Sequence, residues 1–86
     1  MYDLVLTREA SRFYNRAEMP LVRRLNRCFS QLRENPYSHP NIKRLRGSLA
    51  GYWRYRVGDW RVVYEVDDEN ERITVLLIAH RRDVYR

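Results

Sequence analysis

The stretch WRYRVGDWRVVY, residues 53–64, decides the fold of this chain. Arginines stand among aromatic and β-branched residues on both sides of Gly58-Asp59. Gly-Asp is a permitted two-residue hairpin loop, and the flanking residue types favour strands. The stretch therefore predicts an antiparallel hairpin, with strands over residues 53–57 and 60–66.

The arginines of this hairpin are expected on one face. Residues two apart in a strand share a face, which places Arg54 with Arg56. A two-residue turn sets Arg61 directly opposite Arg56, although like charges at paired positions destabilise a sheet. A fold that keeps them there is expected to use them on a phosphate. The alternative is a solvated sheet face with exposed arginines, which is common when helices cover only the other face.

Upstream of the hairpin, the pattern predicts one strand and two helices. Residues 2–6 alternate as a strand, and Thr7 can cap a helix over residues 8–16. Pro20 suits the first turn of a second helix, which Asn35-Pro36 would end. That second helix carries a periodic apolar stripe made of Leu21, Leu25, Cys28, Phe29 and Leu32.

The remaining segments complete a single α+β domain over residues 1–86. Residues 42–45 fit a short strand, residues 67–72 a charged turn, and residues 73–79 a last strand. The order is strand, helical hairpin, then three or four strands in a twisted antiparallel meander. Helices should cover one face of that sheet.

Charge points to the class of partner. The chain has 17 Lys and Arg against 11 Asp and Glu, a net charge of +6 and a pI near 10.0. This balance favours a polyanion or an acidic protein as the partner. The alternative is that the excess charge only gives the protein a basic, soluble surface. With one cysteine, Cys28, no intramolecular disulfide can form, and we expect a buried, inert thiol.

We expect a cytoplasmic protein without membrane association, because no signal peptide or bilayer-long apolar run is visible. We also expect no metal and no cofactor. His39 and His80 lie far apart and have no partners at ligand spacing. There is no Gly-rich phosphate loop.

The tail adds titratable groups. His80, Arg81 and Tyr85 follow the last strand, which should lie beside the strand of Arg61, so they are expected to converge on the arginine patch. Cleavage of RNA at a 2′-OH requires a base, cations that hold the phosphate, and an acid. Arginine can supply only the cations, which leaves His80 and Tyr85 for proton transfer. Tyr55 could stack a base or, as most of the strand aromatics should, fill the core.

Three motifs together resemble the RelE/ParE superfamily of toxins from bacterial toxin–antitoxin pairs. They are KRLRG (residues 43–47), YWRYRVGDWRVVYE (residues 52–65) and HRRDVY (residues 80–85). With the opening strand and helices, the resemblance covers nearly the whole chain. It implies a RelE-like microbial RNase fold. For the RelE-type branch it implies an mRNA endonuclease (mRNA interferase) that works in the ribosomal A site without a metal and inhibits translation.

The resemblance also implies roles for individual residues. Arg54 and Arg56 match two basic residues that contact the scissile region, and lysine stands at both positions in the best-known member. Arg61 matches a residue that stabilises the transition state, and Arg81 one that holds phosphate. Tyr85 matches a tyrosine that stacks on a base or assists proton transfer. His80 lies where related branches use an acid or base. Further RNA contacts are expected from Lys43, Arg44, Arg46 and Arg82.

The expected partners follow from the same resemblance. They are a RelB-like antitoxin that is acidic and partly disordered, mRNA, and ribosomal RNA. The toxin alone should be monomeric and should form a hetero-oligomer with its antitoxin. Two alternatives stay open: a ParE-type inhibitor of DNA gyrase that cleaves no RNA, and a module that binds RNA or antitoxin without catalysis.

Overall fold

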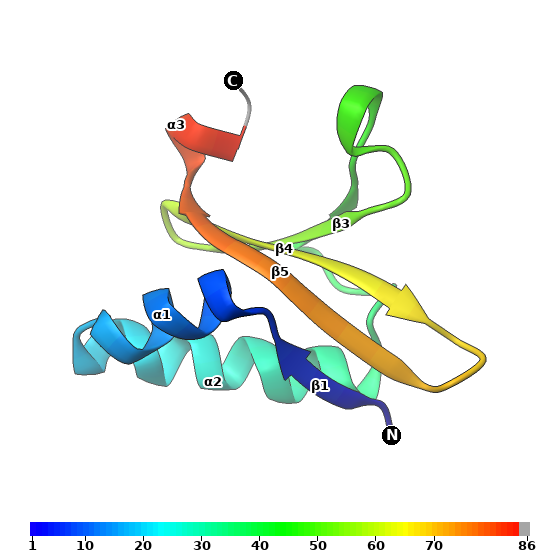
Figure 1. The fold of residues 1–86 in the computed structure, drawn as a ribbon, viewed down its shortest axis with the longest axis horizontal. Helices are drawn as coiled ribbons and strands as arrows, with labels where there is room; N and C mark the ends of the chain where they lie inside the picture. Colours follow the sequence, from blue (N-terminus) through cyan, green and yellow to red (C-terminus); the bar gives the residue numbers. More distant parts are fainter. Residues whose placement is uncertain (85–86) are drawn as a thin grey trace.

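The molecule has two layers, a five-stranded sheet and a pair of helices packed on one of its faces (Figure 1). The structure is a computed structural model and describes residues 1–84. In chain order the elements are β1 (Asp3–Leu6), α1 (Arg8–Arg16), α2 (Met19–Glu34), β2 (Ile42–Arg44), the 3-10 turn η1 (Gly47–Leu49), β3 (Trp53–Val57), β4 (Trp60–Asp67), β5 (Arg72–His80) and α3 (Arg81–Val84). The predicted α+β class and element order are confirmed.

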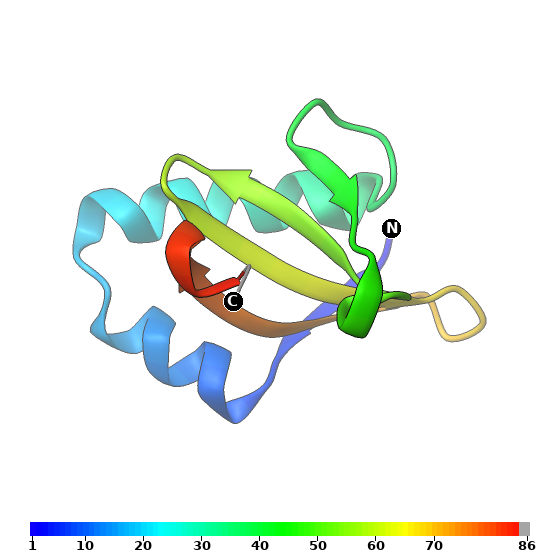
Figure 2. The same ribbon diagram turned by 90° about the horizontal axis from the view of Figure 1, so that it is seen from above.

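The strand order of the sheet is β1-β5-β4-β3-β2. Strands β2 to β5 form the predicted antiparallel meander, and β1 pairs with β5 in parallel. The last strand therefore lies centrally beside β4, as predicted. Seen from above, η1 and α3 both lie over the sheet on the side away from α1 and α2 (Figure 2).

The β3–β4 hairpin has the predicted register. Val57 pairs with Trp60, and Arg56 pairs with Arg61. Gly58 has a φ of 60°, while Asp59 does not have a positive φ. A positive φ at the first central residue alone is the type II′ pattern, whose twist suits a two-residue hairpin and favours glycine at that position.

The helix ends also follow local chemistry. The Thr7 side chain accepts a hydrogen bond from the Ala10 amide at 3.2 Å and caps α1. Pro20 lies in the first turn of α2, where its missing N–H costs nothing. Asn35 ends α2, and its side chain accepts from the amides of Tyr37 and Ser38.

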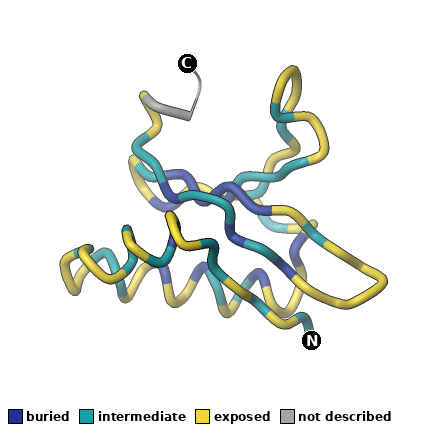
Figure 3. Tube along the Cα trace, viewed as in Figure 1, coloured by how far each residue is buried: buried dark blue, intermediate teal, exposed yellow. Residues whose placement is uncertain are grey.

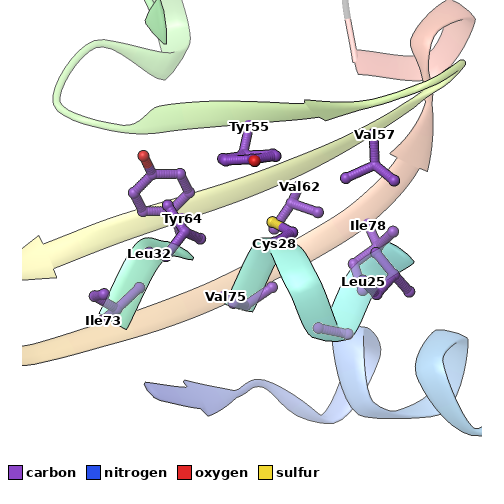
Figure 4. Close-up of a cluster of buried hydrophobic side chains, with 11 residues drawn as sticks. Leu25, Cys28, Leu32, Tyr55, Val57, Val62, Tyr64, Ile73, Val75 and Ile78 are labelled. Atoms are coloured by element: carbon purple, nitrogen blue, oxygen red, sulfur yellow. The ribbon is translucent and has the colours of Figure 1, made fainter. Parts of the chain in front are cut away.

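The core fills the space between α2 and the inner face of the sheet (Figure 4). Buried residues lie along the middle strands and the sheet-facing side of α2, whereas the outer sides of the helices are exposed (Figure 3). Tyr55 and Tyr64 belong to this core, as expected of most of the strand aromatics. The buried Tyr64 hydroxyl donates to the Pro36 carbonyl at 2.7 Å, so its polar atom is satisfied.

A β-bulge interrupts the pairing of β4 with β5. Val63 pairs with Leu77 but Tyr64 pairs with Val75, so the register skips Leu76. The Leu76 carbonyl instead accepts a hydrogen bond from the Thr7 hydroxyl at 2.7 Å. An extra residue reverses which face the later side chains occupy. The bulge therefore decides where the end of β5 points.

Candidate functional site

A strip of cations crosses the sheet face that lies away from α1 and α2. Arg54, Arg56 and Arg61 point to this face, since their strand neighbours Tyr55 and Val57 are buried in the core on the other. We call these three residues the arginine face. The sequence predicted this arrangement, and the turn register enforces it.

Arg61 is largely buried although it is charged. Its side chain is 8% exposed, and its Nη1 donates to the carbonyls of Gly58 and Trp60, each at 3.0 Å. Its Nε is buried and has no hydrogen-bond partner among the residues that the structure describes. An unpaired buried donor on a charged group is costly, which is the condition expected where an anion binds.

Arg54 repeats this arrangement on β3. Its Nη1 donates to the Asn41 carbonyl at 2.7 Å, and its buried Nε has no partner within residues 1–84. Arg54 pairs with Val63, so Arg61 lies diagonally across the hairpin from it. The guanidinium groups on these neighbouring strands thus each have a buried Nε–H without an acceptor among the described residues. Arg56, opposite Arg61, is exposed.

Arg81 joins this end of the strip through the hairpin turn. Its amide donates to the Asp59 carbonyl at 2.8 Å, and its Nε lies 3.9 Å from Asp59 Oδ1. Both side chains are more than half exposed. The structure therefore places Arg81 and Arg61 at the same turn, Gly58-Asp59, as the converging tail predicted.

His80 does not join the arginines. It pairs with Trp60, and its ring packs edge-on against that indole, with 5.4 Å between the ring centroids. The same indole lies 5.0 Å from the ring of Phe13 in α1, so His80 is on the helix side of the sheet. The expected convergence of His80 with the arginines is wrong. The cause is the bulge at Leu76, without which strand alternation would have put His80 on the arginine face.

The other expected RNA contacts divide between the two faces. Lys43 pairs with Arg54, which places it on the arginine face, at the edge strand. Arg44 pairs instead with Trp53, and its guanidinium carbon lies 5.3 Å from the centre of that ring. This cation–π contact puts Arg44 on the opposite face.

The remaining expected contacts lie outside the strands. Arg46 is exposed in the segment before η1, and Arg82 is exposed in α3. Tyr85 lies outside the described residues.

A pocket on the helix side was not foreseen. It has a volume of about 1030 Å³ between α1, α2 and the adjoining ends of β4 and β5. Apolar side chains line it, among them Phe13, Leu21, Trp60 and Ile78. Its rim carries Arg8, Arg12, Arg16 and Arg24, together with Glu9 and Glu18. The spacing of Arg8, Arg12 and Arg16, one helical turn each, was the signal for a basic stripe.

Other chemistry has little support. Among residues 1–84, no group of three or more His, Cys, Asp or Glu side chains is arranged to hold a metal ion. Cys28 is buried, and burial raises the pKa of its thiol, so it remains protonated and unreactive. None of the described helices has the length and apolar character needed to cross a bilayer.

Comparison with known proteins gives consistent matches. The model of the family described as "ParE toxin of type II toxin-antitoxin system, parDE" matches residues 4–85. Two relatives from Mycobacterium tuberculosis are toxin RelG, 43% identical over 44 residues, and toxin RelE, 43% identical over 58 residues. These matches cover 51% and 67% of this chain, and 51% and 58% of the relatives. The chain thus spans about half the length of the curated relatives it matches.

A solved structure agrees over a greater length. The structure of the toxin–antitoxin complex RelBE2 from Mycobacterium tuberculosis contains a chain that superimposes with a TM-score of 0.80 at 28% identity. The superposition covers 93% of this chain and 98% of that one. The RelE-like fold expected from the sequence is confirmed.

Proposed function

Because the chain belongs to the ParE toxin family of type II toxin–antitoxin systems, we propose that it is a RelE-type toxin that cleaves mRNA on the ribosome without a metal. The observation that carries this proposal is the pair of buried Nε atoms of Arg54 and Arg61, which have no partner within the described residues. A phosphodiester supplies the acceptor oxygens that such groups need. Arginine is suited to it, because its donors form a fixed fork and it stays charged.

The proposed step is an attack by the 2′ oxygen of one nucleotide on its own 3′ phosphorus. The new P–O2′ bond forms as the P–O5′ bond breaks, which leaves a 2′,3′-cyclic phosphate and a 5′ hydroxyl. Negative charge on the non-bridging oxygens rises in the transition state. Donors that are already oriented stabilise that charge most. We assign this stabilisation to Arg61 and Arg54, a further contact with the scissile phosphate to Arg81, and binding of the flanking phosphates to Arg56 and Lys43.

Proton transfer needs different groups, because arginine cannot give or take a proton at neutral pH: the 2′ hydroxyl gives its proton to a base as the P–O2′ bond forms, and the leaving 5′ oxygen takes one from an acid as the P–O5′ bond breaks. We assign Tyr85 to proton transfer or to base stacking, since it lies four residues beyond Arg81 in the sequence. Cationic neighbours lower the pKa of a phenol and would favour its use as a base. His80 is not assigned, since it lies on the other face beside Trp60.

We further propose a cognate, acidic and partly disordered antitoxin as the neutralising partner, in a hetero-oligomer. The M. tuberculosis structure that this chain resembles is itself a toxin–antitoxin complex. The pocket beneath Trp60 supports such a partner here. Its apolar lining suits the apolar side of an amphipathic helix. Arg8, Arg12 and Arg16 recur about every 6 Å along α1, which matches acidic residues at i, i+4 and i+8 of that helix.

A ParE-type gyrase inhibitor is the second candidate, because the matching family model is named for ParE. The two differ in what the arginine face does. A nuclease must present donors to a phosphodiester, and the two buried Nε atoms on one sheet face are such donors, whereas inhibition of gyrase does not require them. The buried, unpaired Nε atoms of Arg54 and Arg61 therefore favour cleavage of RNA.

The test is induced expression of the wild-type protein, of Arg61→Ala and of Arg27→Ala in bacteria, with mapping of mRNA 5′ ends. We expect the wild type to stop translation and to create new ends at fixed positions within codons. Arg61→Ala should lower the cleavage rate by roughly 10²-fold or more, as loss of a transition-state donor does. Arg27, exposed on α2, is the matched loss of one positive charge and should keep activity.

Intact mRNA together with DNA damage and filamentation would instead identify a gyrase inhibitor. Harmless expression of the wild type would identify a binding module. Equal cleavage by Arg61→Ala and the wild type would remove the arginine face from the mechanism.

A further inference from the structure

The Gly58-Asp59 turn holds two of the proposed phosphate-binding arginines at once. The carbonyls on either side of Asp59, from Gly58 and Trp60, both accept from Arg61 Nη1. The carbonyl of Asp59 accepts from the amide of Arg81. The turn therefore holds both arginines, in addition to the β4–β5 pairing that sets Ala79 opposite Arg61.

The turn has a defined backbone geometry, and one side chain of α2 lies against it. Gly58 has a φ of 60°, which other residues adopt at a cost. On its other side lies the guanidinium of Arg24 from α2, because a Cβ placed on Gly58 would come within 2.8 Å of Arg24 Nη2. A turn held in this way is a suitable anchor for side chains that must meet a ligand in one geometry.

The Asp59 carboxylate is the one side chain of this turn that contacts Arg81. Its Oδ1 lies 3.9 Å from Arg81 Nε, and this is the only acid–base pair within 4.0 Å among the residues that the structure describes. The chain has 17 Lys and Arg and 11 Asp and Glu. Among so many charged residues, the described part of the chain forms this ion pair at the end of the arginine face. The pair uses the Nε edge of the guanidinium, which leaves its two Nη groups for another anion.

We propose that Asp59 is a positioning residue that orients Arg81 toward the scissile phosphate, an inference that rests on the proposed nuclease function. A long, exposed arginine loses rotamer freedom when it binds a phosphate, and a partner that restricts it beforehand reduces that loss. Asp59 acts only through Arg81 and does not touch RNA. Since exposed ion pairs contribute little to folding, its removal should leave the melting temperature almost unchanged.

Cleavage kinetics on mRNA-programmed ribosomes test the proposal. Asp59→Ala should lower kcat about 3- to 10-fold with little change in KM, as expected when an exposed partner stops orienting a reacting group. Asp59→Asn should fall between Asp59→Ala and the wild type, because the amide oxygen keeps a partial negative charge near Nε but lacks the full charge of the ion pair. The double variant Asp59→Ala/Arg81→Ala should match Arg81→Ala alone, since the two act as a unit.

Glu69→Ala is the control, because it removes the same charge from the tip of the other hairpin. It should leave kcat and KM unchanged. Multiplied, independent losses in the double variant would overturn the proposal. So would a lower KM at constant kcat in Asp59→Ala, which would mean that Asp59 merely repels RNA.

A measurement without RNA separates this inference from the nuclease function. The Nε–H resonance of Arg81 in a ¹⁵N spectrum of the free protein should shift in Asp59→Asn and stay in place in Glu69→Ala. An unchanged Arg81 resonance in Asp59→Asn would overturn the inference even if RNA is cleaved. A shifted resonance would support the orienting contact even if wild-type protein fails to cleave mRNA, an outcome that overturns the nuclease function alone.

Discussion

At the scale of single residues, Arg56 and Arg61 face each other across the β3–β4 hairpin. Directly opposed like charges destabilise a sheet, and Arg61 in addition buries a donor that no described residue accepts. The folded state thus carries a local cost that an anionic ligand can offset.

Arg56→Gln should therefore make the protein more stable. The free energy of unfolding should rise by roughly 0.2–1 kcal/mol, the usual size of a cross-strand pair effect. Urea unfolding at low and high salt measures it, and the gain should shrink in 1 M NaCl, where the Debye length falls to about 3 Å. Arg27→Gln, on the exposed side of α2, should show no comparable gain. A loss of stability in Arg56→Gln would contradict the strained pairing.

This residue pair could be predicted from the sequence because it depends on local rules alone. The Gly58-Asp59 turn fixes the register, and the register fixes the face. The unpaired Nε atoms of Arg54 and Arg61 could not be predicted, because they depend on how deeply each side chain is covered. The Asn41 carbonyl that holds Arg54 comes from a loop whose path no local pattern specified.

At the scale of the elements, the β4–β5 pair shows where local rules fail. Residues 73–79 were expected to form a strand, but β5 carries a bulge at Leu76. The bulge is stabilised from outside the hairpin, since Thr7 of the first helix cap donates to the Leu76 carbonyl. Such a contact between distant segments is invisible to periodicity, and it is the reason that His80 was expected on the wrong face.

The tip of the same hairpin is also more than a solvated turn. Asp68 accepts hydrogen bonds from the hydroxyls of Tyr2 and Tyr37, each at 2.6 Å. These bonds favour the charged carboxylate and hold the pKa of Asp68 below its usual value. The hydrogen bond to Asp68 likewise raises the pKa of Tyr2. The contact joins the N-terminal segment and the loop after α2 to the hairpin.

Stability should depend on the ionisation of Asp68. A depressed pKa in the folded state contributes stability that is present above the unfolded value of about 3.9 and is lost as pH falls through the folded value. The urea midpoint of the wild type should fall over that acid range. Asp68→Asn should lower the midpoint at neutral pH and flatten this part of the profile. Glu69→Gln is the control, and an equally flat profile for it would contradict the specific effect of Asp68.

At the scale of the whole molecule, one thin core supports both the helices and the arginine face. Leu25, Cys28 and Leu32 of α2 meet the inner sides of the central strands (Figure 4). A chain of 86 residues has little stability to spare, since small domains bury a smaller fraction of their surface. Loss of one large core side chain should therefore destabilise the whole domain.

Leu25→Ala should lower the free energy of unfolding by about 2–5 kcal/mol, the range for a fully buried leucine. Because total stability is of order 5–15 kcal/mol, thermal unfolding followed by circular dichroism should show a large fall in Tm. Leu21→Ala, half-buried on the same helix, is the matched control and should lose clearly less. Equal losses would mean that the core is centred elsewhere than described.

The parallel pairing of β1 with β5 has a consequence for how the protein is made. Asp3 lies beside Arg72, and Leu6 beside Val75, so the first strand has no partner until the last strand has been synthesised. Arg61 likewise lacks its neighbour Ala79 until then. A nascent chain that has not yet released residues 72–80 from the exit tunnel cannot complete the sheet. The sheet face proposed for RNA cleavage therefore stays incomplete until residues 72–80 have left the exit tunnel.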